Sequence, residues 1–269
     1  MKIFSNSSDL IKFINNETNL GFVPTMGSLH VGHVSLIKKS ISQCNKTVIS
    51  IFVNKPQFNN KGDFRSYPKT LRKDIFMLKK FKVDYLFSPK EKEIYPNGVN
   101  KKIKVNSIEK NLCGKFRPGH FKAVVDVIER FVKIIKPNKI YLGEKDFQQL
   151  KIIEDYLRKK KNKVKIVPCK TMREKNGIPY SSRNSLLTKN EKIVASKIYR
   201  LIHDLKYKII NKKISIKIIK KKIYLLGVKK IDYLEIIDVN KFIKPYKKKN
   251  KYKIFIAYYL GLTRLIDNI

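Results

Sequence analysis

Short apolar runs alternate with amphipathic segments over the first two thirds of the chain. The apolar runs predict strands at residues 20–23, 47–53, 84–88, 139–142 and 163–167. Apolar positions spaced three and four apart predict helices at residues 7–15, 32–43, 71–81, 121–135 and 147–160. Strands that alternate with helices favour parallel βαβ units, so we expect an α/β fold with a Rossmann-like, doubly wound parallel sheet.

The pattern changes after residue 169. Helices are predicted at residues 191–210 and 215–226, and strands at residues 232–237, 253–260 and 264–269. Two helices followed by consecutive strands are typical of a smaller α+β unit. We therefore expect two domains, a Rossmann-like domain over residues 1–169 and a C-terminal domain over residues 170–269.

Length and hydrophobicity indicate a globular protein. The chain has 269 residues, of which 42% are hydrophobic, enough to bury a full core. The first sixteen residues hold no apolar signal-peptide core, and no run reaches the roughly 18 apolar residues of a membrane span. Cys44, Cys113 and Cys169 are odd in number and widely spaced, which favours reduced thiols. We expect a cytoplasmic protein without membrane association.

A formal net charge of +40 raises the alternative of a nucleic-acid-binding protein. The excess consists mostly of lysine and is spread along the whole chain, whereas a nucleic-acid groove combines clustered charge with stacking aromatics. The basic runs at residues 155–163 and 246–251 are predicted to be surface turns. We expect no specific nucleic acid as a partner.

The segment Pro24-Thr-Met-Gly-Ser-Leu-His-Val-Gly-His33 follows a predicted strand and precedes a predicted helix. Unpaired backbone N–H groups at a helix start attract phosphate, and His30 and His33 can donate hydrogen bonds to it. Two histidines at this spacing can also bind zinc, but no third ligand with supporting spacing is evident. The segment therefore predicts a phosphate site and no protein-bound metal.

Polar residues gather after three further apolar runs. Gln57 follows one strand and can hold a hydroxy acid, although an ordinary turn explains it equally well. Lys145 follows another and can neutralise a polyphosphate, with Asp146 holding that lysine or a magnesium ion or merely capping the next helix. Ser181, Ser182 and Arg183 form a compact set of hydrogen-bond donors for phosphates, but without further context the segment is better explained as an ordinary serine-rich loop. His120 precedes the longest amphipathic segment of the first domain and is expected to shape that loop.

These segments together resemble one family in order and spacing. Pro-Thr-Met-Gly-x-Leu-His-x-Gly-His, Gly-Glu-Lys-Asp-x-Gln-Gln and Ser-Ser-Arg-Asn are similar to the motifs of pantoate–β-alanine ligases, which belong to the nucleotidyltransferase superfamily. The resemblance extends from Val23 to the C-terminal Thr-Arg-Leu-Ile-Asp-Asn. His-x-Gly-His alone indicates only a nucleotidyltransferase, so another enzyme of that class is the first alternative and a basic RNA-binding protein the second.

The resemblance implies an ATP-dependent condensation of pantoate with β-alanine through pantoyl adenylate, with release of pyrophosphate and AMP. It implies Mg²⁺ as the companion of ATP, a homodimer, and a C-terminal domain that closes over the site. His30, His33 and Lys145 would be catalytic, with His33 as proton donor, while Gln57 and Gln149 would hold pantoate. The nucleotide would be bound by Met26, Gly27, Ser28, Leu29, His30, Val31, Gly32, His33, Gly143, Glu144, Lys145, Asp146, Met172, Tyr180, Ser181, Ser182 and Arg183.

Four residues in three segments depart from the family pattern. Pro56 stands one place later than usual before Gln57, which changes the residue whose φ is fixed. Pro179 and Tyr180 precede the two serines, and Pro179 removes a backbone donor. Ala123 replaces a glycine after His120 and Phe121. None of these changes removes a charged or histidine participant.

Overall fold

The computed structural model describes residues 1–242 and 251–269, so most of the predicted basic turn at 246–251 lies outside the described residues. The chain divides into two compact units, Met1–Thr171 and Met172–Ile269. The division falls two residues after the boundary expected from the sequence.

The first unit is built on a six-stranded sheet in which every strand pair is parallel. Its strand order is β1-β4-β3-β2-β5-β6. The strands are β1 (Lys2–Phe4), β2 (Leu20–Thr25), β3 (Lys46–Ile51), β4 (Tyr85–Phe87), β5 (Lys139–Gly143) and β6 (Lys165–Cys169). The predicted doubly wound sheet is confirmed, and β1 is an additional edge strand that the hydrophobic pattern did not predict.

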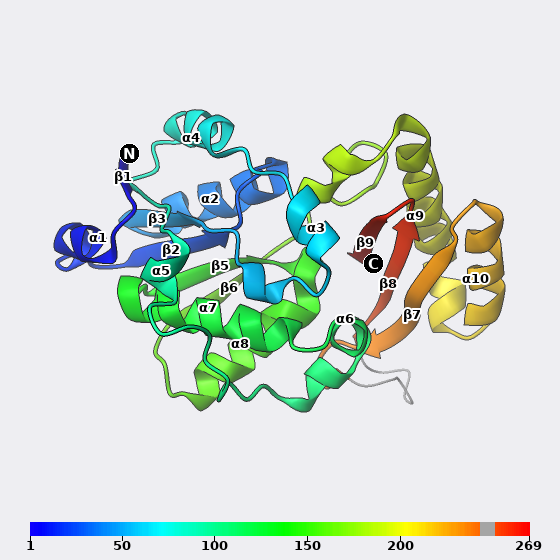
Figure 1. Cartoon of the computed structure of the whole chain (residues 1–269). Helices are drawn as coiled ribbons and strands as arrows, with labels where there is room; N and C mark the ends of the chain where they lie inside the picture. The colour runs from blue at the N-terminus through cyan, green and yellow to red at the C-terminus, as the bar shows by residue number, and fades with distance from the viewer. Residues whose placement is uncertain (243–250) are drawn as a thin grey trace. The chain divides into compact units, whose positions relative to one another are not determined.

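Helices flank this sheet (Figure 1). They are α1 (Ser7–Ile14), α2 (Val31–Gln43), α3 (Lys61–Ser66), α4 (Leu71–Lys79), α5 (Glu91–Ile94), α6 (Leu112–Phe116), α7 (His120–Ile135) and α8 (Phe147–Lys159). Side chains of β2 alternate between the two faces: the Phe22 ring packs against Phe131 of α7, while Val23 joins the core that contains Ile37 of α2. Both faces are therefore buried, as parallel sheets require.

The point where the strand order reverses lies at β2. This strand pairs with β3 on one side and with β5 on the other, so the chain continues in opposite directions from the centre of the sheet. All the strands are parallel, so their carboxyl ends lie at one edge. Ligands of open α/β sheets bind beyond that edge at the reversal point, which here brings together the segments that follow Thr25, Ile51 and Gly143.

The second unit is a three-stranded antiparallel sheet with two helices, as predicted. Its strands β7 (Lys230–Asp238), β8 (Tyr252–Leu260) and β9 (Thr263–Asn268) pair in chain order. Helices α9 (Lys189–Ile210) and α10 (Ile216–Leu225) share a core with the sheet (Figure 1), in which Ile198, Ile219 and Ile254 are almost fully buried. Thr188 and Glu191 form a reciprocal capping box at the start of α9.

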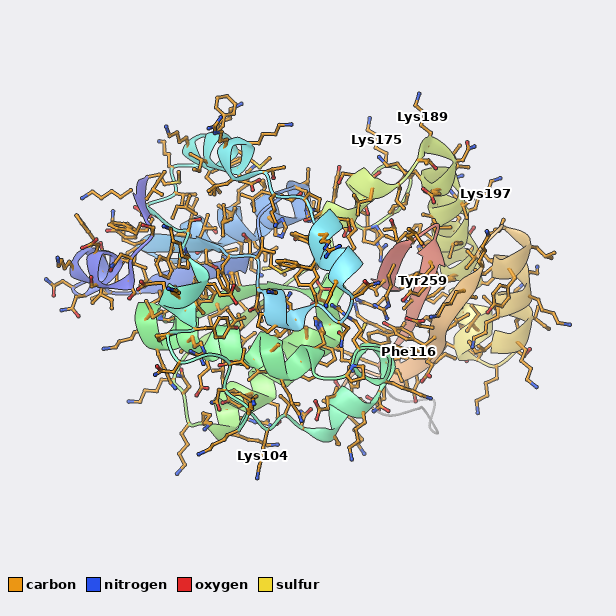
Figure 2. All side chains as sticks on the ribbon, viewed as in Figure 1. Lys104, Phe116, Lys175, Lys189, Lys197 and Tyr259 are labelled. Carbon is orange, nitrogen blue, oxygen red and sulfur yellow. The ribbon has the colours of Figure 1, made fainter. Side chains whose placement is uncertain are left out.

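Lysines lie on exposed faces of both units. Figure 2 shows Lys104, Lys175, Lys189 and Lys197 extending away from the ribbon, and all four are exposed. Such scattered positions agree with a charge excess carried by solvated surfaces. Among the residues that the structure describes, no helix is long and apolar enough to cross a membrane.

Candidate functional site

The turn between β2 and α2 adopts a left-handed conformation at two consecutive residues, Gly27 (φ +77°) and Ser28 (φ +51°). The hydroxyl of Thr25 accepts a hydrogen bond from the Gly27 N–H at 3.2 Å. The next two amides are bound by a carboxylate from another element: Asp74 of α4 accepts from Ser28 N at 2.9 Å and from Leu29 N at 2.8 Å. These two amides are therefore already engaged and differ from the free N–H groups of a simple phosphate loop.

His30 and His33 cap the N-terminus of α2 reciprocally. His30 Nδ1 accepts from Gly32 N at 3.1 Å, and His33 Nδ1 accepts from His30 N at 3.4 Å. The two rings lie with centroids 4.0 Å apart. A ring nitrogen that accepts an N–H carries no proton, so in each neutral ring the proton is on Nε2. The helix start thus presents two Nε2–H donors.

Both imidazoles are held in the neutral form. Burial, followed by the neighbouring Lys145 ammonium, lowers the pKa of His30 to about 4. Burial, followed by His30 and then Lys145, lowers the pKa of His33 well below its ordinary value. Near neutral pH these residues therefore act as uncharged hydrogen-bond donors, and Lys145 supplies the positive charge.

Lys145 lies in the segment that follows β5, on the short 3₁₀ helix η3 (Glu144–Asp146). Its Nζ is 3.6 Å from Asp146 Oδ1, and its side chain is 20% exposed. Asp146 occupies the N-cap position of α8, but its side chain makes no capping hydrogen bond there. Of the three roles open to Asp146 from the sequence, the structure favours contact with the lysine over capping, and a role toward magnesium stays a prediction.

Gln57 follows β3, at the end of the 3₁₀ helix η1 (Lys55–Gln57). Its side-chain amide lies 2.9 Å from Met26 Sδ, which joins the segment after β3 to the segment after β2. Asn54, only 1% exposed, donates to Gln57 Oε1 at 3.1 Å and to the carbonyl of Ala123 at 3.2 Å. Because Ala123 takes part through its carbonyl, either alanine or glycine can fill that position.

His120 and Arg117 hold Gln57 from the backbone side. His120 Nδ1 lies 2.8 Å from the Gln57 carbonyl oxygen, and Arg117 donates to the same oxygen at 3.0 Å. This agrees with the expected role of His120 in shaping its loop. Pro56 lies within the first turn of η1, where its missing N–H is not required, so the shifted proline is compatible with this arrangement.

The two glutamines at the start of α8 have different environments. Gln148 is 5% exposed and donates to the carbonyls of Ile108 and Asn111, both at 2.8 Å. It thereby ties the loop before α6 to α8. Gln149 is half-buried on the first turn of α8, immediately after the Lys145 segment.

In the second unit, residues 172–180 form a short antiparallel hairpin. Tyr180 N donates to Met172 O at 3.0 Å and Glu174 N donates to Ile178 O at 2.8 Å, with Arg173 and Pro179 opposite each other between them. The bonds flank the Arg173–Pro179 pair, so the ladder does not use the N–H that Pro179 lacks. This explains how the chain accommodates proline at that position.

The serine–arginine segment follows this hairpin. Ser181 accepts from Arg183 N at 3.3 Å and caps the 3₁₀ helix η4 (Ser182–Leu186). Asn184 is 7% exposed and donates to Glu174 Oε1 at 2.9 Å and to the carbonyl of Pro179 at 3.0 Å. Arg173 forms a bidentate pair with Asp267 of β9, at 2.7 and 2.8 Å. The hairpin is thus fixed to its own unit by side chains.

Within the first unit, the structure brings the predicted residues Met26 to His33, Gln57, Gly143 to Asp146 and Gln149 to the carboxyl edge of three adjacent strands. The predicted residues Met172, Tyr180, Ser181, Ser182 and Arg183 lie in the second unit. Sequence reasoning missed the two buried groups that hold these segments, Asn54 and Asp74. Asn54 stood in a segment already singled out, whereas nothing near Asp74 in the sequence indicated a role.

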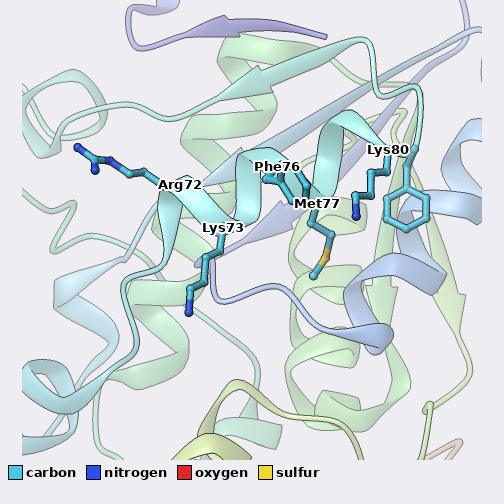
Figure 3. Close-up of a pocket in the computed structure, with 6 residues that line it drawn as sticks. Arg72, Lys73, Phe76, Met77 and Lys80 are labelled. Carbon is cyan, nitrogen blue, oxygen red and sulfur yellow. The ribbon is translucent and has the colours of Figure 1, made fainter.

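A cavity of about 490 Å³ lies along α4, and Asp74 is not among the residues that line it (Figure 3). Its walls are mainly apolar with lysine and arginine at the rim, and it is lined by Arg72, Lys73, Phe76, Met77, Lys80 and Phe81. Of these residues, none belongs to the segments at the carboxyl edge of the sheet. This cavity is a surface feature of α4.

Comparison with known proteins agrees with this geometry. The family model described as pantoate-beta-alanine ligase matches residues 2–269. The chain is 39% identical to the pantothenate synthetase of Francisella tularensis subsp. novicida, over 99% of this chain and 94% of that protein. It is 37% identical to that of Vesicomyosocius okutanii, over 100% and 97% of the two chains.

Solved structures give the same result. A pantoate-beta-alanine ligase from Francisella tularensis, complexed with beta-gamma ATP and beta-alanine, superimposes with a TM-score of 0.88 at 38% identity, covering 100% of this chain and 97% of the other. Pantothenate synthetase from Thermus thermophilus superimposes with a TM-score of 0.91 at 30% identity, covering 100% and 99%. The chain therefore belongs to the pantoate–β-alanine ligase family.

Proposed function

We propose that this chain condenses pantoate with β-alanine at the expense of ATP, through a pantoyl adenylate. The observation that carries the proposal is the pair of neutral imidazoles at the start of α2, both influenced by the Lys145 ammonium. Two uncharged Nε2–H donors and one cation suit a triphosphate whose negative charge shifts during transfer. Family membership identifies pantoate as the acceptor of the adenylyl group.

In the first step, a carboxylate oxygen of pantoate attacks the α-phosphorus of ATP and pyrophosphate leaves. A carboxylate is already a nucleophile, so this step needs no general base. Lys145, His30 and His33 would stabilise the charge that develops on the phosphates, and with neutral rings His33 acts as a hydrogen-bond donor. Gln57, held by Asn54 and His120, and Gln149 would align pantoate with the phosphorus.

In the second step, the amine of β-alanine attacks the mixed anhydride, forming the amide bond and releasing AMP. Met172, Tyr180, Ser181, Ser182 and Arg183 of the second unit would bind the nucleotide in this proposal, since hydroxyls and a guanidinium are donors suited to phosphate. We further propose a homodimer and a cytoplasmic location, both on the strength of family membership.

Magnesium would accompany ATP. Among residues 1–242 and 251–269, no group of three or more histidine, cysteine, aspartate or glutamate side chains is placed to hold a metal ion. Asp146, half-exposed beside Lys145, is a single carboxylate of the kind that Mg²⁺ uses together with phosphate oxygens. The residues therefore fit Mg²⁺ held chiefly by the triphosphate, where it would neutralise phosphate charge.

The test is product formation by the purified chain with ATP, Mg²⁺, pantoate and β-alanine. We expect AMP and pyrophosphate only when pantoate is present, and pantothenate only when both acids are present. Pyrophosphate exchange into ATP that depends on pantoate, in the absence of β-alanine, would detect the adenylate. Turnover that does not require pantoate would instead indicate another nucleotidyltransferase of the His-x-Gly-His class, and no turnover would contradict the proposal.

A further inference from the structure

Asp74 is a buried carboxylate, 2% exposed, on the first turn of α4. Both of its oxygens accept hydrogen bonds, two from the turn after β2 and the others from the N-cap residue of α4. They accept from Ser28 N at 2.9 Å, from Leu29 N at 2.8 Å, and from the Thr70 hydroxyl at 3.2 Å. Thr70 stands at the N-cap position of α4 but makes no capping bond, and its hydroxyl faces the carboxylate instead. The three donors satisfy the hydrogen-bonding capacity that burial would otherwise leave unmet.

The turn that Asp74 binds has a conformation that needs such support. Ser28 is a non-glycine residue in the left-handed region, which is unfavourable unless its surroundings fix it. At Gly27, an added Cβ would lie 3.1 Å from Asp74 Oδ2, so the carboxylate packs directly against the backbone. The chain reaches His30, the N-cap of α2, only one residue after Leu29. The direction in which α2 begins therefore depends on this contact.

We propose that Asp74 is a positioning residue for the transfer reaction, acting through the Gly27–Leu29 turn to set His30 and His33 with their Nε2–H groups toward the phosphates. The inference rests on the proposed function for the reaction itself. The amides of Ser28 and Leu29 are bound to Asp74 and are therefore not phosphate donors. The donors to phosphate are then the imidazoles of His30 and His33, together with Lys145 from the segment after β5. Asp74 itself touches neither substrate nor nucleotide.

The two faces of α4 offer a matched control. Asp74 and Leu78 are buried, while Lys73 is exposed and lines the cavity shown in Figure 3. Asp74→Asn keeps the size of the side chain but leaves one oxygen to accept two amides. Lys73→Asn introduces the same side chain one residue away on the solvent side. Thr70→Val removes only the hydroxyl donor, which makes it a milder second perturbation.

The experiment measures kcat, the KM for pantoate, and the histidine side chains by long-range ¹H–¹⁵N spectra of the full chain at neutral pH. The chain has four histidines, so the ring signals can be assigned by substitution. We expect kcat of Asp74→Asn to fall about 100-fold, as misplacement of a catalytic group by about an ångström can cause, with the KM for pantoate within about twofold. The ring signals of His30 and His33 should no longer be those of a neutral imidazole with its proton on Nε2 alone. Thr70→Val should lower kcat about fivefold, and Lys73→Asn should match the wild type.

Wild-type kcat and unchanged ring signals in Asp74→Asn would overturn the proposal. A loss that appears equally in kcat and in pantoate KM, with unchanged ring signals, would show a general structural role and overturn it as well. Should Asp74→Asn fail to fold, Thr70→Val decides the matter by the same criteria. If the wild type forms no AMP, the proposed function fails, while the ring signals of the variants still decide whether Asp74 positions the histidines.

Discussion

Two loops carry the phosphate-binding chemistry proposed for this chain, and they are held in different ways. The turn at Gly27–Leu29 in the first unit is fixed through its backbone, by two amides bonded to Asp74. The hairpin at residues 172–180 in the second unit is fixed through a side chain, by the bidentate pair of Arg173 with Asp267. Each anchor is a buried or largely buried carboxylate from another part of the same unit.

The difference follows from what each loop presents. The first loop presents neutral imidazoles, whose donor atoms depend on the backbone bonds that their Nδ1 atoms accept. A shift of the backbone in the first loop therefore changes which ring nitrogen of each histidine can donate a hydrogen bond. The second loop leads directly into Ser181, Ser182 and Arg183, whose donor groups do not depend on a ring tautomer. Its anchor only needs to keep the hairpin in place, which an ion pair can do.

The largest effect on stability is expected when the side-chain anchor is removed. Arg173→Met removes the guanidinium that pairs with the Asp267 carboxylate, which is 7% exposed, and breaking a buried ion pair in this way typically costs about 3–5 kcal/mol. Urea unfolding should show this loss, with hydrogen exchange increased first in β8 and β9. Arg200→Met, at an exposed site on α9, should change stability by less than about 0.5 kcal/mol. Equal effects of the two variants would show that the ion pair is not the anchor.

The largest effect on activity is expected at Lys145. Lys145→Ala removes the positive charge that we assign to the phosphate site beside the first loop, and loss of one transition-state donor typically costs about 2.7–4 kcal/mol in kcat/KM. Lys151→Ala, six residues further along the chain on α8 and partly exposed, is the control and should retain wild-type kcat/KM. A near-wild-type value for Lys145→Ala would remove this residue from the proposed machinery.

Glycines in the second unit separate backbone strain from close packing. Gly177 (φ +89°) and Gly227 (φ +93°) share a left-handed conformation, but an added Cβ would come within 2.0 Å of the Tyr199 ring only at Gly177, and would meet nothing within 4 Å at Gly227. Gly227→Ala should therefore cost about 1–2 kcal/mol from φ alone. Gly177→Ala should cost clearly more, because Tyr199 also stacks on the Arg173 anchor at 4.5 Å. Equal losses in thermal unfolding would mean that Tyr199 moves aside freely.

The elements of the fold were predictable because they are long and periodic. Every predicted strand and helix lies within two residues of an observed one, and α7 shows why: its apolar residues recur every three or four positions over sixteen residues. β1 could not be predicted in this way, since it has three residues, and only Phe4 is partly buried. Its place is fixed by pairing with β4, more than eighty residues away in the chain.

The site was predictable only where its residues are adjacent in sequence. His30 and His33 were recognisable from their spacing and from the glycines beside them, whereas Asp74 lies 45 and 46 residues from the amides it binds. Its neighbours Lys73 and Ile75 are those of an ordinary amphipathic helix. The same limit applied to His120, whose partner is the main-chain carbonyl of Gln57, an atom that no side-chain pattern reveals.

The final test uses pH to separate the two loops. Burial lowers the pKa of His30 from 6.5 to about 4 in the folded chain, so between these values the unfolded state binds a proton that the folded state does not. Stability should therefore rise with pH across this range, by about 1.4 kcal/mol per pH unit for each such group, and level off above pH 6.5. His33 has the same sign, because its pKa is also lowered. Residues 172–183 hold no histidine, so this contribution belongs to the first loop.

His30→Asn is the matched variant, since asparagine can still cap α2 but does not titrate. The free energy of unfolding is measured with urea between about pH 5 and pH 6.5. It should rise more steeply with pH in the wild type than in His30→Asn, and the difference in slope should equal the contribution of the His30 imidazole. Parallel slopes would show that His30 is protonated in the folded chain at these pH values. The first loop would then present a cation, like the second, and the contrast between neutral and charged donors would be wrong.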